Sequence, residues 1–187
     1  AYARPDIITA LGMKRDRQAT LLVRTALNDA DVMVRKEAAA ALVSLESKDA
    51  AGALISYLLK YGSPDDQSAA KAALMTVTGS GNINLILPVL KEGSPAAKRT
   101  AIEIFAWHKD PKYFTDIFPF TSSSDEMLKN AAFKALAGLA GPADIGKLLG
   151  LMAATEKPEN IADIQSALVK AAEGISEPEK RSEAIPK

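Results

Sequence analysis

The strongest constraint on the fold is an apolar pattern that returns about every 31 residues along the chain. One apolar or small residue of each repeat is taken as its anchor, namely Leu11, Leu42, Leu74, Phe105, Leu136 and Ala172. Successive anchors are separated by about 31, 32, 31, 31 and 36 positions. Small or apolar residues also stand one and four positions before each anchor. These offsets place the apolar residues on one face of an α-helix. Each return of the pattern therefore predicts one amphipathic helix.

A second apolar stripe follows each of the first five helices with nearly the same period. Its leading residues are Val23, Ile55, Ile86, Ile117 and Leu148, and mostly apolar residues follow them at offsets of three and four. The short breaks between the two stripes, such as Gly79-Ser80-Gly81, leave room only for a reversal of direction. The pattern predicts antiparallel helix pairs. Because one pair cannot bury both of its stripes, neighbouring pairs must stack on one another.

Residues typical of helix starts stand in register with this pattern. In each of repeats two to five, the residue just before the first helix is expected to act as its N-cap. These residues are Asp31, Ser63, Ser94 and Asp125. The repeats are expected to span residues 1–28, 29–61, 62–92, 93–122, 123–155 and a truncated 156–187, within a single domain of residues 1–187. The sixth first helix is expected to run from about Pro158 to Ile175, with a truncated second helix after Pro178. The longer last step predicts a longer connection around residues 156–161.

Composition supports an all-α chain and narrows the function. Alanine, the best helix former, accounts for 34 of the 187 residues. Lys and Arg together number 23, as do Asp and Glu, so the basic excess of a typical nucleic-acid-binding protein is absent and nucleic acid is not the expected partner. The chain has no cysteine and one histidine, His108, so no metal site and no cofactor are expected. We expect His108 to lie at a helix end near the core.

No apolar run is long enough to span a bilayer. The chain begins without Met and stops within what reads as another helix, so we expect a fragment of a longer protein or a mature form without its leader. The sequence is compatible with both a cytoplasmic and an exported protein. It does not predict the oligomeric state.

The segment DVMVRKEAAAAL, from Asp31 to Leu42, resembles the HEAT-repeat family and is especially similar to the HEAT-like repeats of the phycobilisome-lyase type. The resemblance covers nearly the whole chain. It implies a right-handed α-solenoid of about five to six helix pairs, with the second helices lining the concave side. The family's arginine position is occupied in successive repeats by Arg4, Arg35, Gln67, Lys98, Lys129 and Gln165. Since the family includes scaffolds, transport adaptors, lyase subunits and DNA glycosylases, the resemblance implies a fold rather than an activity.

Candidate binding residues stand at the outward positions of the second helices. They are Arg24, Tyr57, Lys60, Lys91 and Phe118, with Tyr57 as the expected anchor of a protein partner. The alternative for Phe118 is packing between neighbouring second helices, and Tyr57 could equally be structural.

Trp107 is a further candidate, because its equivalents Ser44, Thr76 and Gly138 are small or polar. The alternatives are that Trp107 covers the neighbouring turn or docks to sequence outside this chain.

No catalytic residue is expected. Asp65-Asp66 and Asp125-Glu126 stand in first turns, where negative charge complements the helix dipole, and Ser122-Ser123-Ser124 reads as a loop. The leading hypothesis is a non-enzymatic protein-interaction scaffold or docking module. The alternatives are a nucleic-acid-binding protein of the DNA-glycosylase type and a lyase or chaperone subunit.

Overall fold

The computed structural model describes residues 3–46, 49–79 and 82–175. Within these residues every regular element is helical and there is no β-strand, so the predicted all-α class is confirmed at that level. The chain divides into two compact units, unit 1 comprising Ala1–Ile104 and unit 2 comprising Phe105–Lys187.

The described residues form α-helices of four to sixteen residues joined by short turns. Their bounds are α1 Ala3–Met13, α2 Thr20–Ala26, α3 Val32–Ser44, α4 Ala50–Lys60, α5 Pro64–Thr78, α6 Leu87–Glu92, α7 Pro95–His108, α8 Phe114–Ile117, α9 Glu126–Leu139, α10 Ile145–Ala153 and α11 Pro158–Glu173. Short 3₁₀ helices comprise Arg17–Ala19, Ile83–Ile86, Pro111–Tyr113, Phe118–Ser122 and Pro142–Asp144.

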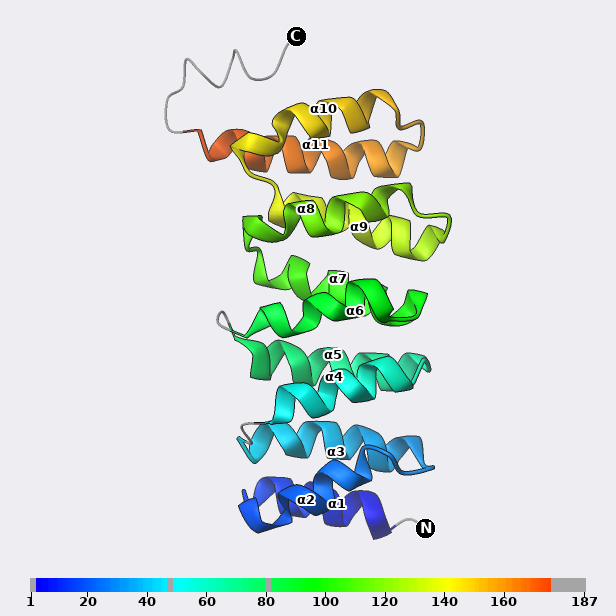
Figure 1. Cartoon of the computed structure of the whole chain (residues 1–187), viewed down its shortest axis with the longest axis vertical. Helices are drawn as coiled ribbons and strands as arrows, with labels where there is room; N and C mark the ends of the chain where they lie inside the picture. The colour runs from blue at the N-terminus through cyan, green and yellow to red at the C-terminus, as the bar shows by residue number, and fades with distance from the viewer. Residues whose placement is uncertain (1–2, 47–48, 80–81, 176–187) are drawn as a thin grey trace. The chain divides into compact units, whose positions relative to one another are not determined.

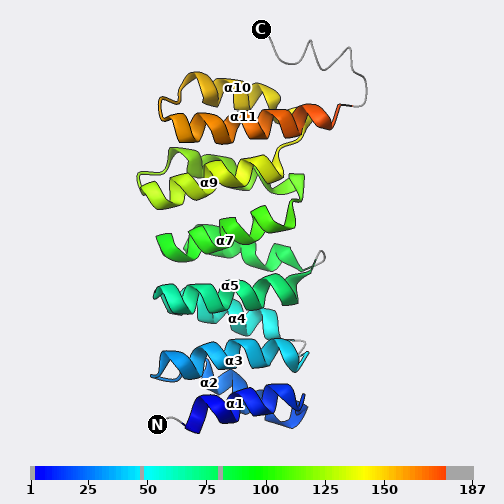
Figure 2. The ribbon, with the colours of Figure 1, turned by 180° about the vertical axis from the view of Figure 1, so that it is seen from behind.

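Unit 1 consists of two helical layers. Helices α1, α3 and α5 lie side by side in one layer, here named the A layer (Figure 2). Helices α2, α4 and α6 form the other layer, here named the B layer (Figure 1). Contacts of α2 with α3 and of α4 with α5 join the layers. Helices α3 and α5 therefore each contact a neighbour in the A layer and a helix of the B layer.

Unit 2 repeats this arrangement on a smaller scale. Helix α9 packs against α11, α10 packs against α11, and α8 packs against α9. Phe105, Tyr113, Phe114 and Phe133 are all at most 2% exposed and fill its core with aromatic rings. Tyr113 lies 4.6 Å from Phe105 between ring centroids.

The predicted N-caps are confirmed by hydrogen bonds. The side chains of Asp31, Ser63 and Asp125 accept from first-turn amides of α3, α5 and α9, and Ser94 Oγ accepts from the amide of Ala97. These bonds satisfy donors that the helix itself leaves free.

Helices α1, α3, α5 and α7 are each followed, within two residues of their last residue, by a residue with positive φ. Arg15, Glu46 and Lys109 have φ values of 50°, 50° and 56°, and Gly79 has 44°. A left-handed residue stops helical propagation and reverses the chain, as the turns between the two layers require.

The anchors of the first stripe behave as predicted in the middle of the chain. Leu42, Leu74, Phe105 and Leu136 are 0% exposed, whereas Leu11 is half-buried. The last of these helices, α11, begins at Pro158 as expected, but its anchor was wrong, because its N-cap residue Lys157 stands 32 residues after Asp125. The connection before α11 is therefore short, and Leu168 takes the buried position expected for Ala172.

Two consequences follow from this corrected register. Gln165 is exposed and does not continue the arginine position of the earlier repeats. The second helix expected after Pro178 lies outside the described residues.

Small residues allow the A layer of unit 1 to pack closely. A Cβ placed on Gly12 would lie 2.9 Å from both Cα and Cβ of Ala41. The backbones of α1 and α3 thus meet at a distance that only glycine permits at position 12.

Candidate functional site

The B layer of unit 1 carries the candidate residues Arg24, Tyr57 and Lys60. These residues of α2 and α4 line one pocket of about 190 Å³, together with Asn28 and Ser56. The structure thus brings Arg24 of α2 to the same pocket as Tyr57 and Lys60 of α4.

Two positive charges border this pocket. Lys60 donates a hydrogen bond of 2.7 Å to Oδ1 of Asn28, and its ammonium lies 5.1 Å from the ring centroid of Tyr61. Nη1 of Arg24 lies 3.7 Å from Oδ2 of Asp49, and both side chains are well exposed. An exposed pair at this distance contributes little stability, because water screens it. Both cations are therefore accessible to a ligand.

Tyr57 does not lie on the surface, and its predicted exposure is wrong. Only 3% of the residue is exposed, because Leu54, Tyr57 and Leu58 form the buried stripe of α4. The sequence pattern had placed that stripe at Ile55, Leu58 and Leu59. A shift of one residue rotates a helix by about 100°, which turns Tyr57 from the outward face into the core.

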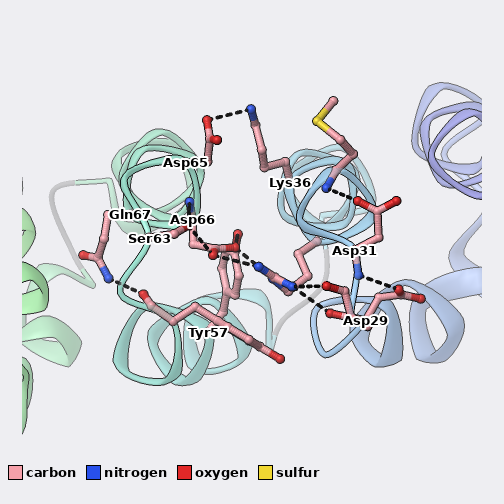
Figure 3. A network of polar contacts seen from close by, with 12 residues as sticks. Asp29, Asp31, Lys36, Tyr57, Ser63, Asp65, Asp66 and Gln67 are labelled. Carbon is pink, nitrogen blue, oxygen red and sulfur yellow. Dashed lines mark hydrogen bonds and ion pairs between the residues drawn. The ribbon is translucent and has the colours of Figure 1, made fainter.

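The phenol of Tyr57 belongs to a buried polar network that joins α3, α4 and α5 (Figure 3). Arg35 donates two parallel hydrogen bonds to Asp66, from Nε at 2.9 Å and from Nη2 at 2.8 Å. Tyr57 donates to Oδ1 of Asp66 at 2.7 Å, and Ser63 donates to Oδ2 at 2.5 Å. Every oxygen of this carboxylate is therefore occupied by a donor of the protein.

Arg35 is equally well satisfied. Its Nη1 donates to the backbone carbonyls of Asp29 and Ala30, at 2.9 and 3.0 Å. Its guanidinium carbon lies 4.2 Å from the ring centroid of Tyr61. Arg35 thus uses its donors in three directions to connect the α2–α3 turn with α5.

The network fixes the charge of Asp66. Burial alone would raise the pKa of this carboxyl, but hydrogen bonds from Arg35, Ser63 and Tyr57 lower the pKa to about 2. Burial and the hydrogen bond to Asp66 raise the pKa of Tyr57. The hydrogen bond to Asp66 likewise raises the pKa of Arg35. A carboxylate with both oxygens occupied and a guanidinium that donates to it and to two backbone carbonyls are suited to a structural role.

A second set of bonds continues from the neighbouring residue, Gln67. Its Nε2 donates to the carbonyls of Leu58 at 3.0 Å and of Tyr61 at 2.5 Å. Its Oε1 accepts from Oγ1 of Thr100 on α7 at 2.8 Å. The sequence analysis had interpreted Asp66 only as a complement to the helix dipole. The spacing of 31 residues between Arg35 and Asp66 is the signal that could have identified their pairing.

The remaining candidates occupy different places. Lys91, on α6 of unit 1, is exposed. Phe118 of unit 2 is half-buried, with its ring centroid 5.4 Å from that of Phe114. Trp107 of unit 2 is 54% exposed, and its ring meets that of His108 edge-on at 4.9 Å. Burial lowers the pKa of His108, in keeping with its predicted position near the core.

The lysines of the two layers of unit 1 have different hydrogen-bond and ion-pair partners. In the A layer, Lys36 pairs with Asp65 at 3.1 Å and Lys71 pairs with Glu103 at 2.8 Å. In the B layer, Lys91 forms no ion pair with a described residue, and Lys60 bonds only a neutral amide. Helices α2, α4 and α6 together contain one acidic residue, Glu92. The B layer therefore presents a positive surface formed by Arg24, Lys60 and Lys91, here named the cationic face.

Other kinds of site find little support in the residues that the structure describes. They contain no group of three or more potential metal ligands. None of their helices is both long and apolar enough to cross a membrane.

Comparison with known proteins gives a fold but no family. No family model and no curated protein matches the sequence. Among solved structures, an engineered protein is similar over 92% of this chain and 88% of its own, with a TM-score of 0.53 and 17% identity. The complex of CpcE and CpcF of phycocyanin lyase from Nostoc sp. PCC7120 is similar over 88% of this chain and 72% of its own, with a TM-score of 0.41 and 22% identity. The first similarity shows a shared fold, and the second is too weak to carry an argument about activity.

Proposed function

We propose that this chain is a non-enzymatic protein-interaction module built from HEAT-like helix pairs, and that the cationic face of unit 1 binds an acidic segment of a partner protein. The finer architecture expected from the sequence belongs to the same proposal. It is a single repeat domain in the form of a right-handed solenoid of about five to six pairs. The recurrence of N-caps at steps of about 31 residues supports the repeated helix pair of this architecture.

The observation that carries the proposal is the contrast between the two layers of unit 1. Lysines of the A layer are neutralised by carboxylates of the adjacent helix. Lys60 and Lys91 have no carboxylate partner among the described residues, and Arg24 has only the longer, exposed pair with Asp49 at 3.7 Å, so these cations remain available to an external anion. Charges arranged in this way increase the rate of association and the specificity for an oppositely charged partner.

The pocket beside Lys60 adds shape to this charge. Asn28 and Ser56 line it with polar groups, and Tyr57 closes it from within. An acidic side chain that entered the pocket would displace Asn28 as the hydrogen-bond partner of Lys60. Tyr57 is therefore assigned a supporting role in place of the anchoring role predicted from the sequence.

The test is fluorescence anisotropy with a labelled peptide rich in Asp and Glu, compared with a peptide of the same length in which Gln replaces each acidic residue. The triple variant Arg24→Ala, Lys60→Ala, Lys91→Ala should bind the acidic peptide at least about tenfold more weakly. The matched control is Lys36→Ala with Lys71→Ala and Lys98→Ala, which removes the same charge from first helices. Equal loss in both triple variants, or equal binding of the Gln peptide, would show that the cationic face is not the recognition surface.

A duplex DNA of random sequence serves as a third ligand in the same assay. Salt-sensitive binding of DNA that the Arg24, Lys60 and Lys91 substitutions abolish would favour the nucleic-acid alternative instead. The expected result is that DNA binds more weakly than the acidic peptide, because the net charge of the chain is zero.

A further inference from the structure

The pocket between α2 and α4 is lined by hydrogen-bond donors that the chain itself leaves free. Its lining residues are Arg24, Leu27, Asn28, Ala53, Ser56, Tyr57 and Lys60. Tyr57 donates its hydroxyl to Asp66, so its ring contributes only apolar surface, and Ser56 donates its hydroxyl to the carbonyl of Gly52. The donors that remain for a ligand belong to Arg24, Asn28 and Lys60.

The carboxamide of Asn28 is oriented by Lys60. Because an ammonium group can only donate, the 2.7 Å bond between the two side chains uses Oδ1 of Asn28 as the acceptor. The nitrogen at the other end of the carboxamide donates to no residue that the structure describes. Asn28 is an exposed residue and thus offers two free N–H groups at the pocket.

The two cations at the same pocket also have donors to spare. Lys60 uses one of its three N–H groups on Asn28. The guanidinium of Arg24 lies 3.7 Å from the carboxylate of Asp49, which is too long for a hydrogen bond, and the side chain of Asp49 is 77% exposed. This pair can open without leaving a buried charge behind, so Arg24 is available to a ligand.

This set of donors fits a doubly charged group better than a carboxylate. A carboxylate has two oxygens and one charge, whereas a phosphate ester has three terminal oxygens and carries about −1.5 to −2 charges at pH 7. The charges of Arg24 and Lys60 match that dianion. A carboxylate that displaced Asn28 from Lys60 would gain one bond and break another, but a group with three oxygens can accept from both residues and leave their bond in place.

The size of the pocket limits the ligand to one group of a larger molecule. Its volume of about 190 Å³ lies below the roughly 300–1,000 Å³ of pockets that enclose whole small molecules. A phosphorylated side chain needs to place only its phosphate and its first carbons inside. Leu27 and Ala53 offer apolar contacts to those carbons. A short side chain of a bound peptide therefore fits both the volume and the donors.

We propose that the pocket between α2 and α4 recognises a phosphoserine or phosphothreonine within the acidic segment that binds the cationic face. This inference rests on the proposed function and names the group that anchors the partner there. Arg24 and Lys60 neutralise the phosphate and donate to its oxygens, and the carboxamide nitrogen of Asn28 donates to the oxygen that remains.

The test is fluorescence anisotropy with labelled peptides that share one acidic sequence and differ at a central position. One peptide carries phosphoserine there, one carries two glutamates so that its net charge is nearly the same, and one carries serine. The phosphoserine peptide should bind at least about tenfold more tightly than the glutamate peptide. Arg24→Ala and Asn28→Ala should each reduce this preference at least about fivefold, and Asn28→Ala should leave the affinity for the glutamate peptide within about twofold.

Asp49→Asn should change affinity in the opposite direction. The side chain of Asp49 forms no capping bond at α4, so the substitution leaves that helix start intact. It frees Arg24 and removes a repulsion that is stronger for a dianion, so the phosphoserine peptide should bind about threefold more tightly. Asp65→Asn is the matched control, because it removes the same charge from the A layer, where Asp65 pairs with Lys36. Unchanged affinity in Asp49→Asn would overturn the placement of the phosphate beside Arg24.

The outcomes separate this inference from the proposed function. A phosphoserine peptide that binds no more tightly than the glutamate peptide overturns the inference, while the cationic face still stands if the triple variant of Arg24, Lys60 and Lys91 weakens both peptides. If no acidic peptide binds, the proposed function fails as well. A preference for phosphoserine that survives both Arg24→Ala and Asn28→Ala would place the phosphate elsewhere. Inorganic phosphate that displaces the peptide at an equal concentration would make the bare ion the ligand, which also overturns the inference.

Discussion

Tyr57 donates a hydrogen bond of 2.7 Å to Oδ1 of Asp66, nine residues further along the chain. The bond joins the buried face of α4 to the first turn of α5, at the carboxylate that also receives Arg35 from α3. Three helices of unit 1 thus meet at one anion, and several properties of the protein should depend on it.

Tyr57→Phe should destabilise the protein without changing its fold. Removing the phenol leaves Asp66 one donor short while the ring keeps its packing, so the free energy of unfolding should fall by about 1–2 kcal/mol. Urea denaturation followed by circular dichroism measures this change. The matched control is Tyr61→Phe, because the ring of Tyr61 stacks on Arg35 and that contact does not need the hydroxyl. An equal loss in both variants would mean that the bond to Asp66 contributes nothing specific.

Stability should depend on acid pH through Asp66. Its pKa is about 2 in the folded chain and about 3.9 in an unfolded one, so protonation favours the unfolded state. The contribution of about 2–3 kcal/mol is complete above about pH 5 and is lost as the pH falls from there toward 2. Urea denaturation of the parent and Asp66→Asn proteins should show a large difference near pH 7 that narrows steadily below about pH 4. A difference independent of pH would exclude Asp66 as the titrating group.

Thr100→Val tests the continuation of the network into α7. The Oγ1 of Thr100 donates to Oε1 of Gln67 at 2.8 Å, and both residues are buried. Valine keeps the shape but leaves the amide oxygen without a donor, so we expect a loss of about 1–3 kcal/mol in the free energy of unfolding. Thr76→Val is the matched control, because Thr76 is exposed and its hydroxyl bonds only to its own helix. A loss in the control as large as in Thr100→Val would attribute the effect to valine in a helix.

A pair of glycine substitutions should have opposite signs. Gly12→Ala places a methyl group 2.9 Å from Cα of Ala41, so α1 and α3 must separate, and the free energy of unfolding should fall by about 1–3 kcal/mol. Gly52→Ala in α4 meets nothing within 4 Å and should raise stability by about 0.5–1 kcal/mol through helix propensity. Thermal unfolding of both variants measures the difference. Stabilisation by Gly12→Ala would contradict the close contact of α1 and α3.

Local patterns predicted the helical elements well because they arise from neighbouring residues. Asp31, Ser63 and Asp125 cap their helices as expected, since capping requires only a side-chain oxygen two or three residues before a free amide. Pro88, which has no backbone N–H, stands within the first two residues of α6, after the 3₁₀ helix Ile83–Ile86. The start of α11 at Pro158 was predicted, but its anchor was placed at Ala172 instead of Leu168, because both residues belong to one i, i+4 stripe and Lys157 is not a residue type that marks a helix start.

The candidate site was less predictable. The α4 segment is apolar on most of its faces, so its period permits two rotations that differ by one residue. Only the packing of Tyr57 beside Asp66 selects between them.

The sequence by itself determined that the chain forms amphipathic helices in pairs, where each helix starts in the middle of the chain, and which residues anchor the apolar stripes. These properties follow from offsets of a few residues, which the backbone geometry of a helix converts directly into faces and ends. Only the tertiary structure decided that Tyr57 is buried and that Arg35 and Asp66 share a network. Those outcomes depend on which side chains from different helices come within about 3 Å of one another, and hydrogen bonding is too short-ranged for a repeat pattern to specify it.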